Sequence, residues 1–305
     1  MKDYLNDRFG RIKLVARLGG PGLVVKKILL GGILKPAVNS LNYHRKKGKY
    51  PRNIIFIAGF PKSGSTWFAR MLAGIDGFAP FTPRRWATKP AKEWKPAHDL
   101  YPGVFEEFAH RLAVVKGHTW GTEDNVALLR ASGLRYFVTV RDPRDQIISS
   151  YWYIRSRPLH REWKLAQALS LEEFITHKLN SGVYAREELA WLRSWVDRLG
   201  EEQAALIRYE DLLADTCRIM RMACAHLGFA CADEEIRAIV ERNSFARLAG
   251  RPRGVEDRSS FVRKGVTGEW RTVFNEAQKR QFARIGEDVL SRFGYAPTLS
   301  SLTVG

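Results

Sequence analysis

The stretch Asn53-Ile-Ile-Phe-Ile-Ala-Gly-Phe-Pro-Lys-Ser-Gly-Ser-Thr-Trp67 decides the fold. Its first half is a short apolar run, rich in branched side chains and bounded by Gly59 and Pro61, which predicts a buried parallel strand. Its second half is a Gly/Ser loop that contains Lys62, and residues 68–75 continue at helical spacing. A strand that leads through such a loop into a helix presents backbone N–H groups and a positive helix end to an anion. The stretch therefore predicts a phosphate-binding loop.

The position of the lysine separates this loop from the common nucleotide-binding loop. That loop runs Gly-x-x-x-x-Gly-Lys-[Ser/Thr], with the lysine directly after the second glycine. Here Gly59 and Gly64 keep the separation, but Ser65 occupies the lysine position and Lys62 lies earlier. Hydrolysis of ATP or GTP with Mg²⁺ is therefore disfavoured, and an atypical P-loop kinase or NTPase is kept as an alternative.

Short apolar runs and helical patterns alternate along the rest of the chain. Strands are predicted at residues 113–116, 135–140 and 204–208, whereas Pro80 argues against a strand at residues 77–81. Helices are predicted at residues 100–112, 123–131, 143–154, 171–178 and 184–199. This alternation predicts a single α/β domain of the P-loop type, with a central parallel sheet flanked by helices. Ligands of such sheets bind beyond the carboxyl ends of the strands.

Much of the positive charge belongs to the N-terminal arm. The formal net charge is +18, of which residues 1–52 carry +11. The expected organisation is a basic arm or helix at residues 1–52, the α/β domain at 53–298 and a tail at 299–305. The arm either packs on the domain as a helix, or residues 1–35 contact an anionic membrane surface peripherally. Its apolar run is too short to span a membrane, and a cytoplasmic location is expected.

Three cysteines, Cys217, Cys224 and Cys231, lack the spacing of a metal site and predict buried, reduced thiols. Cys217 and Cys224 are expected to face the same core from one helix. The sequence pI of about 10.0 raises the alternative of a non-enzymatic nucleic-acid binder. Because much of the charge lies in the arm, no nucleic acid is expected as a partner.

Two further motifs follow predicted strands. In Lys116-Gly-His118, a histidine lies at a strand end close to a lysine, and a neutral imidazole is the usual general base near pH 7. In Arg141-Asp-Pro-Arg-Asp-Gln-Ile-Ile-Ser149, Asp142 and Pro143 predict a helix start. This segment is either an ordinary strand-to-helix turn with surface charges or a second phosphate site formed by Arg141 and Ser149.

These blocks resemble the PAPS-dependent sulfotransferases of the cytosolic type, where PAPS is 3′-phosphoadenosine-5′-phosphosulfate. Residues 61–67 are similar to the 5′-phosphosulfate loop of that family, and Lys116 and His118 match its Lys-x-His pair, with glycine for the usual threonine. Arg141 and Ser149 keep the spacing of its 3′-phosphate motif. Residues 263–270 resemble its Arg-Lys-Gly-x-x-Gly-Asp-Trp motif, with glutamate for the aspartate. The resemblance extends from about residue 54 to residue 274.

The resemblance implies transfer of a sulfuryl group from PAPS to an acceptor hydroxyl, with release of the bisphosphate PAP and no metal. The implied catalytic residues are Lys62, Lys116 and His118, with His118 as the base. The implied PAPS-binding residues are Lys62, Ser63, Gly64, Ser65, Thr66, Trp67, Arg141, Ser149, Tyr209, Phe245, Arg263, Lys264 and Gly265.

The acceptor is expected to be a hydroxyl-bearing small molecule, glycan or glycolipid. Residues 82–98 are expected to border its site, because they lie between the phosphate loop and the base in the sequence. Trp86 and Trp94, among several basic residues, would suit a sugar ring. The alternative interpretation is an irregular surface loop with solvated lysines.

Overall fold

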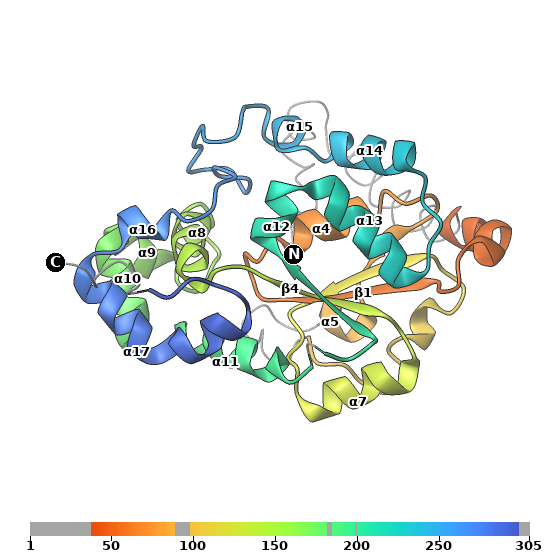
Figure 1. Ribbon diagram of the computed structural model, residues 1–305, viewed down its shortest axis with the longest axis horizontal. Helices are drawn as coiled ribbons and strands as arrows, with labels where there is room; N and C mark the ends of the chain where they lie inside the picture. The colour runs from red at the N-terminus through yellow and green to blue at the C-terminus, as the bar shows by residue number, and fades with distance from the viewer. Residues whose placement is uncertain (1–37, 89–97, 182–184, 199, 299–305) are drawn as a thin grey trace.

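A parallel sheet forms the centre of the protein (Figure 1). The computed structural model describes residues 38–88, 98–181, 185–198 and 200–298. Within these residues the sheet has five strands in the order β2-β3-β1-β4-β5, and every neighbouring pair is parallel. The strands are β1 (Ile54–Gly59), β2 (Ala79–Phe81), β3 (Ala113–Gly117), β4 (Tyr136–Val140) and β5 (Ala204–Arg208). The expected α/β fold with a central parallel sheet is confirmed.

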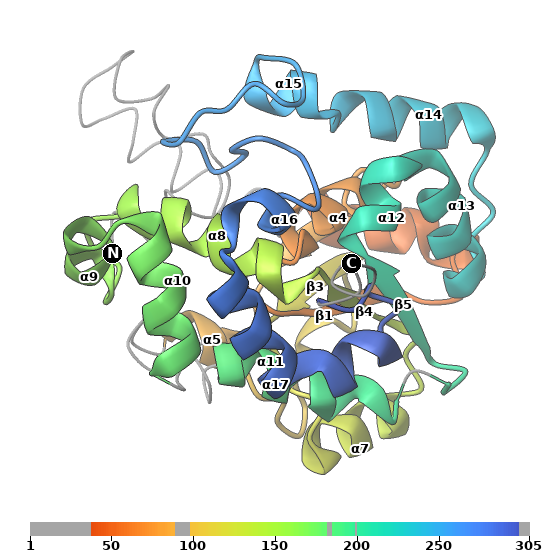
Figure 2. The ribbon, with the colours of Figure 1, turned by 60° about the vertical axis from the view of Figure 1, so that its left-hand side comes forward.

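Helices cover both faces of the sheet. One face packs against α4 (Ser65–Leu72), α12 (Tyr209–Ala214), α13 (Thr216–Leu227) and α14 (Asp233–Arg242). The opposite face packs against α5 (Arg84–Thr88), α7 (Glu123–Ser132) and α11 (Ala185–Val196). Beside the sheet stand α8 (Pro143–Arg155), α9 (Trp163–Ala168), α10 (Leu171–Asn180), α16 (Trp270–Val273) and α17 (Glu276–Arg292) (Figure 2). The remaining elements are η1 (Lys47–Lys49), η2 (Glu106–Phe108) and α15 (Phe245–Ala249).

The central strand β1 explains why the quoted stretch has no alternation of polar and apolar residues. All six of its residues are buried. Ile55 and Ile57 join the core on the α4 side, and Phe56 and Ala58 join the core on the α7 side. A strand covered on both faces needs apolar side chains at every position.

Two elements differ from the sequence expectations. Residues 79–81 form strand β2 despite Pro80, because β2 lies at the edge of the sheet and pairs with β3 alone among the described strands, and a proline is tolerated at such an edge. The helix expected at residues 100–112 is wrong, since only the short η2 is helical there. Pro102 and Gly103 explain the difference, because Gly103 adopts a left-handed φ of 81° that ends a helix.

Other local signals in the sequence act as expected. Asp142 caps α8 by accepting the Arg144 N–H at 3.0 Å, and Pro143 occupies the first turn. Cys217 and Cys224 both lie in α13 and contact the same core, where Cys224 is buried and Cys217 partly buried. No helix within the described residues is long and apolar enough to cross a membrane. The predicted membrane contact of residues 1–35 and the tail at 299–305 lie outside the described residues.

Candidate active site

The predicted phosphate loop connects the carboxyl end of β1 to α4. Gly59 packs tightly against β4, where a Cβ would lie 2.1 Å from the Thr139 hydroxyl, so no larger residue fits. Lys62 has a φ of 71° and is the one non-glycine residue with positive φ in the described part of the chain. Gly64 caps α4, which begins at Ser65. This turn leaves the first N–H groups of α4 without acceptors inside the helix, at the end of β1.

Neighbouring elements fix the backbone of this loop. The Ser63 hydroxyl is buried and lies 3.1 Å from the hydroxyl of Thr139 on β4. Gln146 of α8 donates its side-chain amide to the carbonyl of Pro61 at 2.6 Å. Ser65 is also buried, whereas Thr66 is half-buried. The loop is therefore attached to both β4 and α8, which suits a preformed anion cradle.

Lys62 lies between two aromatic rings. Its ammonium is 4.5 Å from the ring centroid of Tyr153 on α8 and 4.1 Å from that of Phe261. The two rings meet edge to face with their centroids 6.0 Å apart. Cation–π attraction holds an ammonium in such a place without neutralising its charge. Lys62 thereby links the phosphate loop to the segment that precedes Arg263.

His118 follows β3 directly and contacts the phosphate loop. Its Nδ1 lies 2.5 Å from the carbonyl oxygen of Gly59. Because a carbonyl can only accept a hydrogen bond, Nδ1 carries the proton and Nε2 keeps its lone pair. Burial lowers the pKa of His118 well below its ordinary value, and the charges of Lys116 and His98 lower it further. The imidazole is therefore neutral at pH 7 and can accept a proton.

Arg141 follows β4 and is buried. Its guanidinium carbon lies 4.5 Å from the ring centroid of Tyr209, and its Nη2 donates to the carbonyl of Val266 at 3.2 Å. Its Nε is buried and has no hydrogen-bond partner among the described residues. A buried cationic donor in this state fits an anionic acceptor such as a phosphate. Ser149, expected to join Arg141, lies two turns into α8 and is half-buried.

The three aromatic residues among the implied PAPS-binding residues form two contact groups. Trp67 and Tyr209 meet edge to face with their ring centroids 6.2 Å apart, and Tyr209 also packs on the backbone of Gly64. Phe245 is buried and packs on the backbone of Gly265. The first group adjoins the phosphate loop directly. The second group includes Gly265, next to Val266, whose carbonyl accepts a hydrogen bond from Arg141.

Arg263 and Lys264 are paired with carboxylates in this structure. The Arg263 guanidinium is buried and contacts both Glu256 and Glu269. The Lys264 ammonium lies 3.2 Å from Glu269. Glu256 also pairs with Arg258 at 3.2 Å. The two carboxylates therefore offset most, though not all, of the positive charge that Arg258, Arg263 and Lys264 bring to this part of the site.

The turn after β4 is a buried ionic cluster, so the interpretation of its charges as surface charges is wrong. Arg144 is fully buried and makes a two-pronged ion pair with Asp142, at 2.8 and 2.7 Å. It also donates to the hydroxyl of Thr298 at 2.9 Å and the carbonyl of Ala296 at 3.0 Å. Its guanidinium carbon lies 3.7 Å from the ring centroid of Trp270. Arg144 thus joins α8 to the C-terminal segment.

Sequence reasoning missed two buried acids near Arg141. Asp145 accepts the backbone N–H of Gly268 at 2.5 Å and that of Trp270 at 2.9 Å, which fixes the loop before α16. Glu188 of α11 is fully buried, and both of its carboxyl oxygens lack a partner among the described residues. Burial raises the pKa of Glu188 well above its ordinary value, and Asp142 raises it further. Asp145 lies within the motif at residues 141–149 and could have been suspected, whereas an amphipathic helix gives no signal for Glu188.

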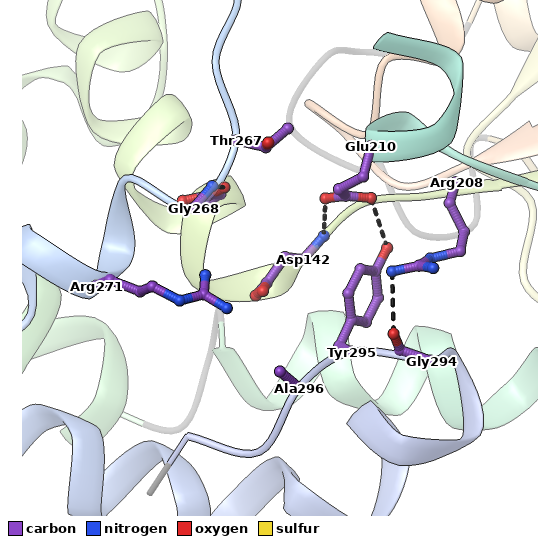
Figure 3. A pocket seen from close by; sticks show the side chains of 10 residues that line it. Asp142, Arg208, Glu210, Thr267, Gly268, Arg271, Gly294, Tyr295 and Ala296 are labelled. Atoms are coloured by element: carbon purple, nitrogen blue, oxygen red, sulfur yellow. Dashed lines mark hydrogen bonds between the residues drawn. The ribbon is translucent and has the colours of Figure 1, made fainter. Parts of the chain in front are cut away.

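A cavity of about 350 Å³ adjoins this cluster (Figure 3). Glu210 accepts the Asp142 N–H at 3.0 Å and the Tyr295 hydroxyl at 3.2 Å, while Arg208 donates to the carbonyl of Gly294 at 3.0 Å. None of the sequence-predicted site residues lines it. Within the described residues no group of three or more His, Cys, Asp or Glu side chains could hold a metal ion. The cavity is a polar space, open to solvent, to which residues 294–296 of the C-terminal segment contribute one part of the lining.

The expected sugar platform at Trp86 is wrong. The Trp86 indole is buried and donates its N–H to the carbonyl of Asp99 at 3.0 Å, so its faces are not open to a sugar ring. The chain turns Trp86 inward because Gly117 leaves space for it at the end of β3. Trp94 lies outside the described residues.

Comparisons with known proteins agree with this architecture. The family model described as "Sulfotransferase domain" matches residues 52–294. Sulfotransferase 2A1 from Homo sapiens is 23% identical over 255 residues, covering 78% of this chain and 84% of the human protein. Two structures share the fold. Mouse sulfotransferase SULT7A1 complexed with PAP has a TM-score of 0.60 at 20% identity, covering 83% of this chain and 90% of the other. Retinol dehydratase in complex with androsterone and inactive cofactor PAP has a TM-score of 0.59 at 18% identity, covering 82% and 85%.

The family model covers more than half of the chain and includes each segment that carries a predicted site residue. The chain therefore belongs to the sulfotransferase domain family, which confirms the assignment of this protein as a PAPS-dependent sulfotransferase.

Proposed function

We propose that residues 53–298 form the catalytic domain, and that His118 is the general base that deprotonates an acceptor hydroxyl. The hydrogen bond between His118 Nδ1 and the Gly59 carbonyl carries this proposal, because it attaches a neutral imidazole directly to the phosphate loop. A base must lie within hydrogen-bond reach of the group that it deprotonates, next to the group under attack.

The donor PAPS is proposed to bind along the carboxyl ends of β1, β4 and β5. The 5′-phosphosulfate would lie on Lys62 and on residues 63–66, and adenine would lie beside Trp67, Tyr209 and Phe245. The 3′-phosphate would bind Arg141, whose unpartnered Nε supports this role, together with Ser149 and residues 263–265. The SULT7A1 and retinol dehydratase structures, which share this fold, both contain PAP.

The charges of the site suit an in-line transfer of the sulfuryl group. By analogy with phosphoryl transfer, negative charge builds on the oxygen that leaves with the 5′-phosphate. Lys62 and the first N–H groups of α4 would stabilise that oxygen. Lys116 would hold the sulfuryl oxygens, while His118 Nε2 takes the proton of the acceptor hydroxyl.

The acceptor is proposed to be an alcohol or phenol on an apolar skeleton. Tyr153 and the exposed Phe261 flank Lys62, so two aromatic rings border the phosphate loop on the side from which an acceptor could approach. Retinol dehydratase, which shares the fold, forms a complex with androsterone. A glycan or glycolipid acceptor is the competing outcome of the test below.

Calorimetry and a transfer assay test this function together. We expect PAP to bind, and the sulfur label of [³⁵S]PAPS to pass to sterols or phenols in preference to glycans and glycolipids. Preferred labelling of glycans or glycolipids would overturn the acceptor class alone. Failure of both PAPS and PAP to bind the folded protein would overturn the whole proposal. Turnover of ATP with Mg²⁺, or salt-dependent retention on DNA without transfer, would point to the alternatives.

Glu256 is expected to compete with the 3′-phosphate for Arg263. The substitution Glu256→Gln removes one of the two carboxylates that offset the charge of Arg263, so PAP should bind roughly 3- to 10-fold more tightly. Glu234→Gln is the matched control, because Glu234 is an exposed residue of α14 that pairs with Arg237 on the same helix. Calorimetric titration with PAP measures both variants. Unchanged or weaker binding by Glu256→Gln would refute the competition.

A further inference from the structure

The proposed base His118 stacks on a second histidine, His98. The two imidazole centroids are 4.9 Å apart and the ring planes meet at 26°. The backbone N–H of His118 donates to Nδ1 of His98 at 2.8 Å. The carbonyl of His98 accepts the Thr119 hydroxyl at 2.8 Å. His98 therefore contacts the base loop through its ring face, its ring nitrogen and its backbone.

Trp86 packs on His98 and extends the stack. Their ring centroids are 5.1 Å apart, with an interplanar angle of 34°. A Cβ at position 117 would lie 2.6 Å from the Trp86 indole and 2.8 Å from the Thr119 hydroxyl. The glycine between Lys116 and His118 is thus the residue that lets the tryptophan approach the base loop. Glycine in place of the threonine of the family's Lys-Thr-His pattern therefore makes room for the aromatic stack.

We infer that His98 is a positioning residue for the sulfuryl-transfer base, an inference that rests on the proposed role of His118. Through its contacts with the His118 backbone N–H and ring, His98 holds the imidazole in the orientation in which Nδ1 donates to Gly59 and Nε2 stays available. His98 itself exchanges no proton in the reaction. The proton of the acceptor hydroxyl moves to His118 Nε2, and the proton on His118 Nδ1 stays there, donated to the Gly59 carbonyl.

The hydrogen bond fixes the tautomer of His98. Because its Nδ1 accepts the His118 N–H, Nδ1 must be unprotonated, so the neutral ring carries its proton on Nε2. In a cationic His98 both ring nitrogens carry protons, so Nδ1 could no longer accept the hydrogen bond from the His118 N–H. The pair therefore works with both rings neutral before transfer, and only His118 gains charge during it.

Two substitutions separate the effect of the hydrogen-bond acceptor on His98 from the effect of its stacked ring. His98→Asn keeps an acceptor oxygen near the position of Nδ1 and loses the ring, whereas His98→Phe keeps a stacked ring and loses the acceptor. We expect His98→Phe to lower kcat roughly 10- to 100-fold, since a small displacement of a catalytic group has effects of this size. His98→Asn should restore kcat to within about threefold of wild type. In both variants calorimetry should show PAP affinity unchanged, and the KM for the acceptor should move little.

The outcomes distinguish this inference from the proposed function. If His118→Ala abolishes transfer while both His98 variants keep wild-type kcat, His98 has no positioning role and the function stands. If His118→Ala keeps its activity, the proposed base itself is wrong. An equal loss of kcat in His98→Phe and His98→Asn, with PAP affinity and melting temperature retained, would overturn the acceptor role of Nδ1.

A measurement on the wild-type protein decides the matter if the variants fail to fold. A long-range ¹H–¹⁵N spectrum of histidine-labelled protein at pH 7 reports which ring nitrogen carries the proton. We expect His98 Nδ1 in the unprotonated range and the His118 amide proton to exchange slowly. A proton on His98 Nδ1 would contradict the hydrogen bond and the inference with it.

Discussion

Replacement of His118 with alanine is expected to lower kcat by roughly 10²- to 10⁴-fold. The reason is that the imidazole is neutral and bonded to the phosphate loop, so its loss leaves the acceptor hydroxyl without a base. PAP affinity should stay within about twofold of wild type, because His118 is placed to contact the acceptor rather than the nucleotide. Single-turnover transfer of the ³⁵S label, compared with calorimetric PAP binding, measures the two effects separately.

His110→Ala is the matched control for this variant. His110 precedes β3, whereas His118 follows it, and His110 is exposed at the opposite end of the strand. Its loss should leave kcat unchanged. Near-wild-type turnover by His118→Ala would remove His118 from the chemistry. An equal loss in both variants would show that the substitutions act through the stability of β3.

Replacement of Arg141 with alanine is expected to weaken PAP binding by roughly 30- to 1,000-fold. The guanidinium is buried and its Nε has no partner among the described residues, and truncation of one member of a buried charged pair has effects of about 2–4 kcal/mol. Binding of adenosine-5′-phosphosulfate should change little, because that ligand lacks the 3′-phosphate. Arg141→Lys should fall between alanine and wild type, since lysine keeps the charge and loses the planar fork.

Arg135→Ala is the control at the other end of the same strand. Arg135 directly precedes β4, pairs with Glu202 and is half-buried, so PAP affinity should be unaffected by its loss. Thermal melting of both variants is needed, because burial raises the pKa of nearby Glu210 and Asp145 and the charge of Arg141 offsets part of that rise. Equal weakening of PAP and adenosine-5′-phosphosulfate would contradict the 3′-phosphate role of Arg141.

Local sequence was enough to predict four of the five strands, all but β2, and the places where chemistry could lie. An apolar run with no polar alternation indicated that β1 is buried on both faces, and the loop after it indicated an anion site. His118, Arg141 and Tyr209 each follow a strand directly in the chain. Because parallel strands end at one edge of a sheet, these positions had to lie at the same edge. The order of motifs therefore predicted which residues could form the site.

Contacts between residues far apart in the chain could not be predicted in this way. Arg144 looked like a surface charge, because nothing in its own segment shows that residues 296 and 298 fold over it. Pro80 argued against a strand, since a proline is tolerated only at a sheet edge. Whether residues 79–81 lie at an edge depends on the strand order, which only the folded structure shows. The pairing of Arg263 with Glu256 and Glu269 depends on the path of one loop.

The amino-acid sequence by itself determined the α/β fold, the sulfotransferase family and the candidate site residues, because these follow from short-range periodicity and from motifs a few residues long. The tertiary structure alone decided which charges are buried, which carboxylates occupy the 3′-phosphate clamp, and which ring stacks on the proposed base. The physical reason is that burial and pairing are set by segments that meet only after folding. His98 and His118 are twenty residues apart in the chain, and their rings come into contact only when the segments on either side of β3 are packed together.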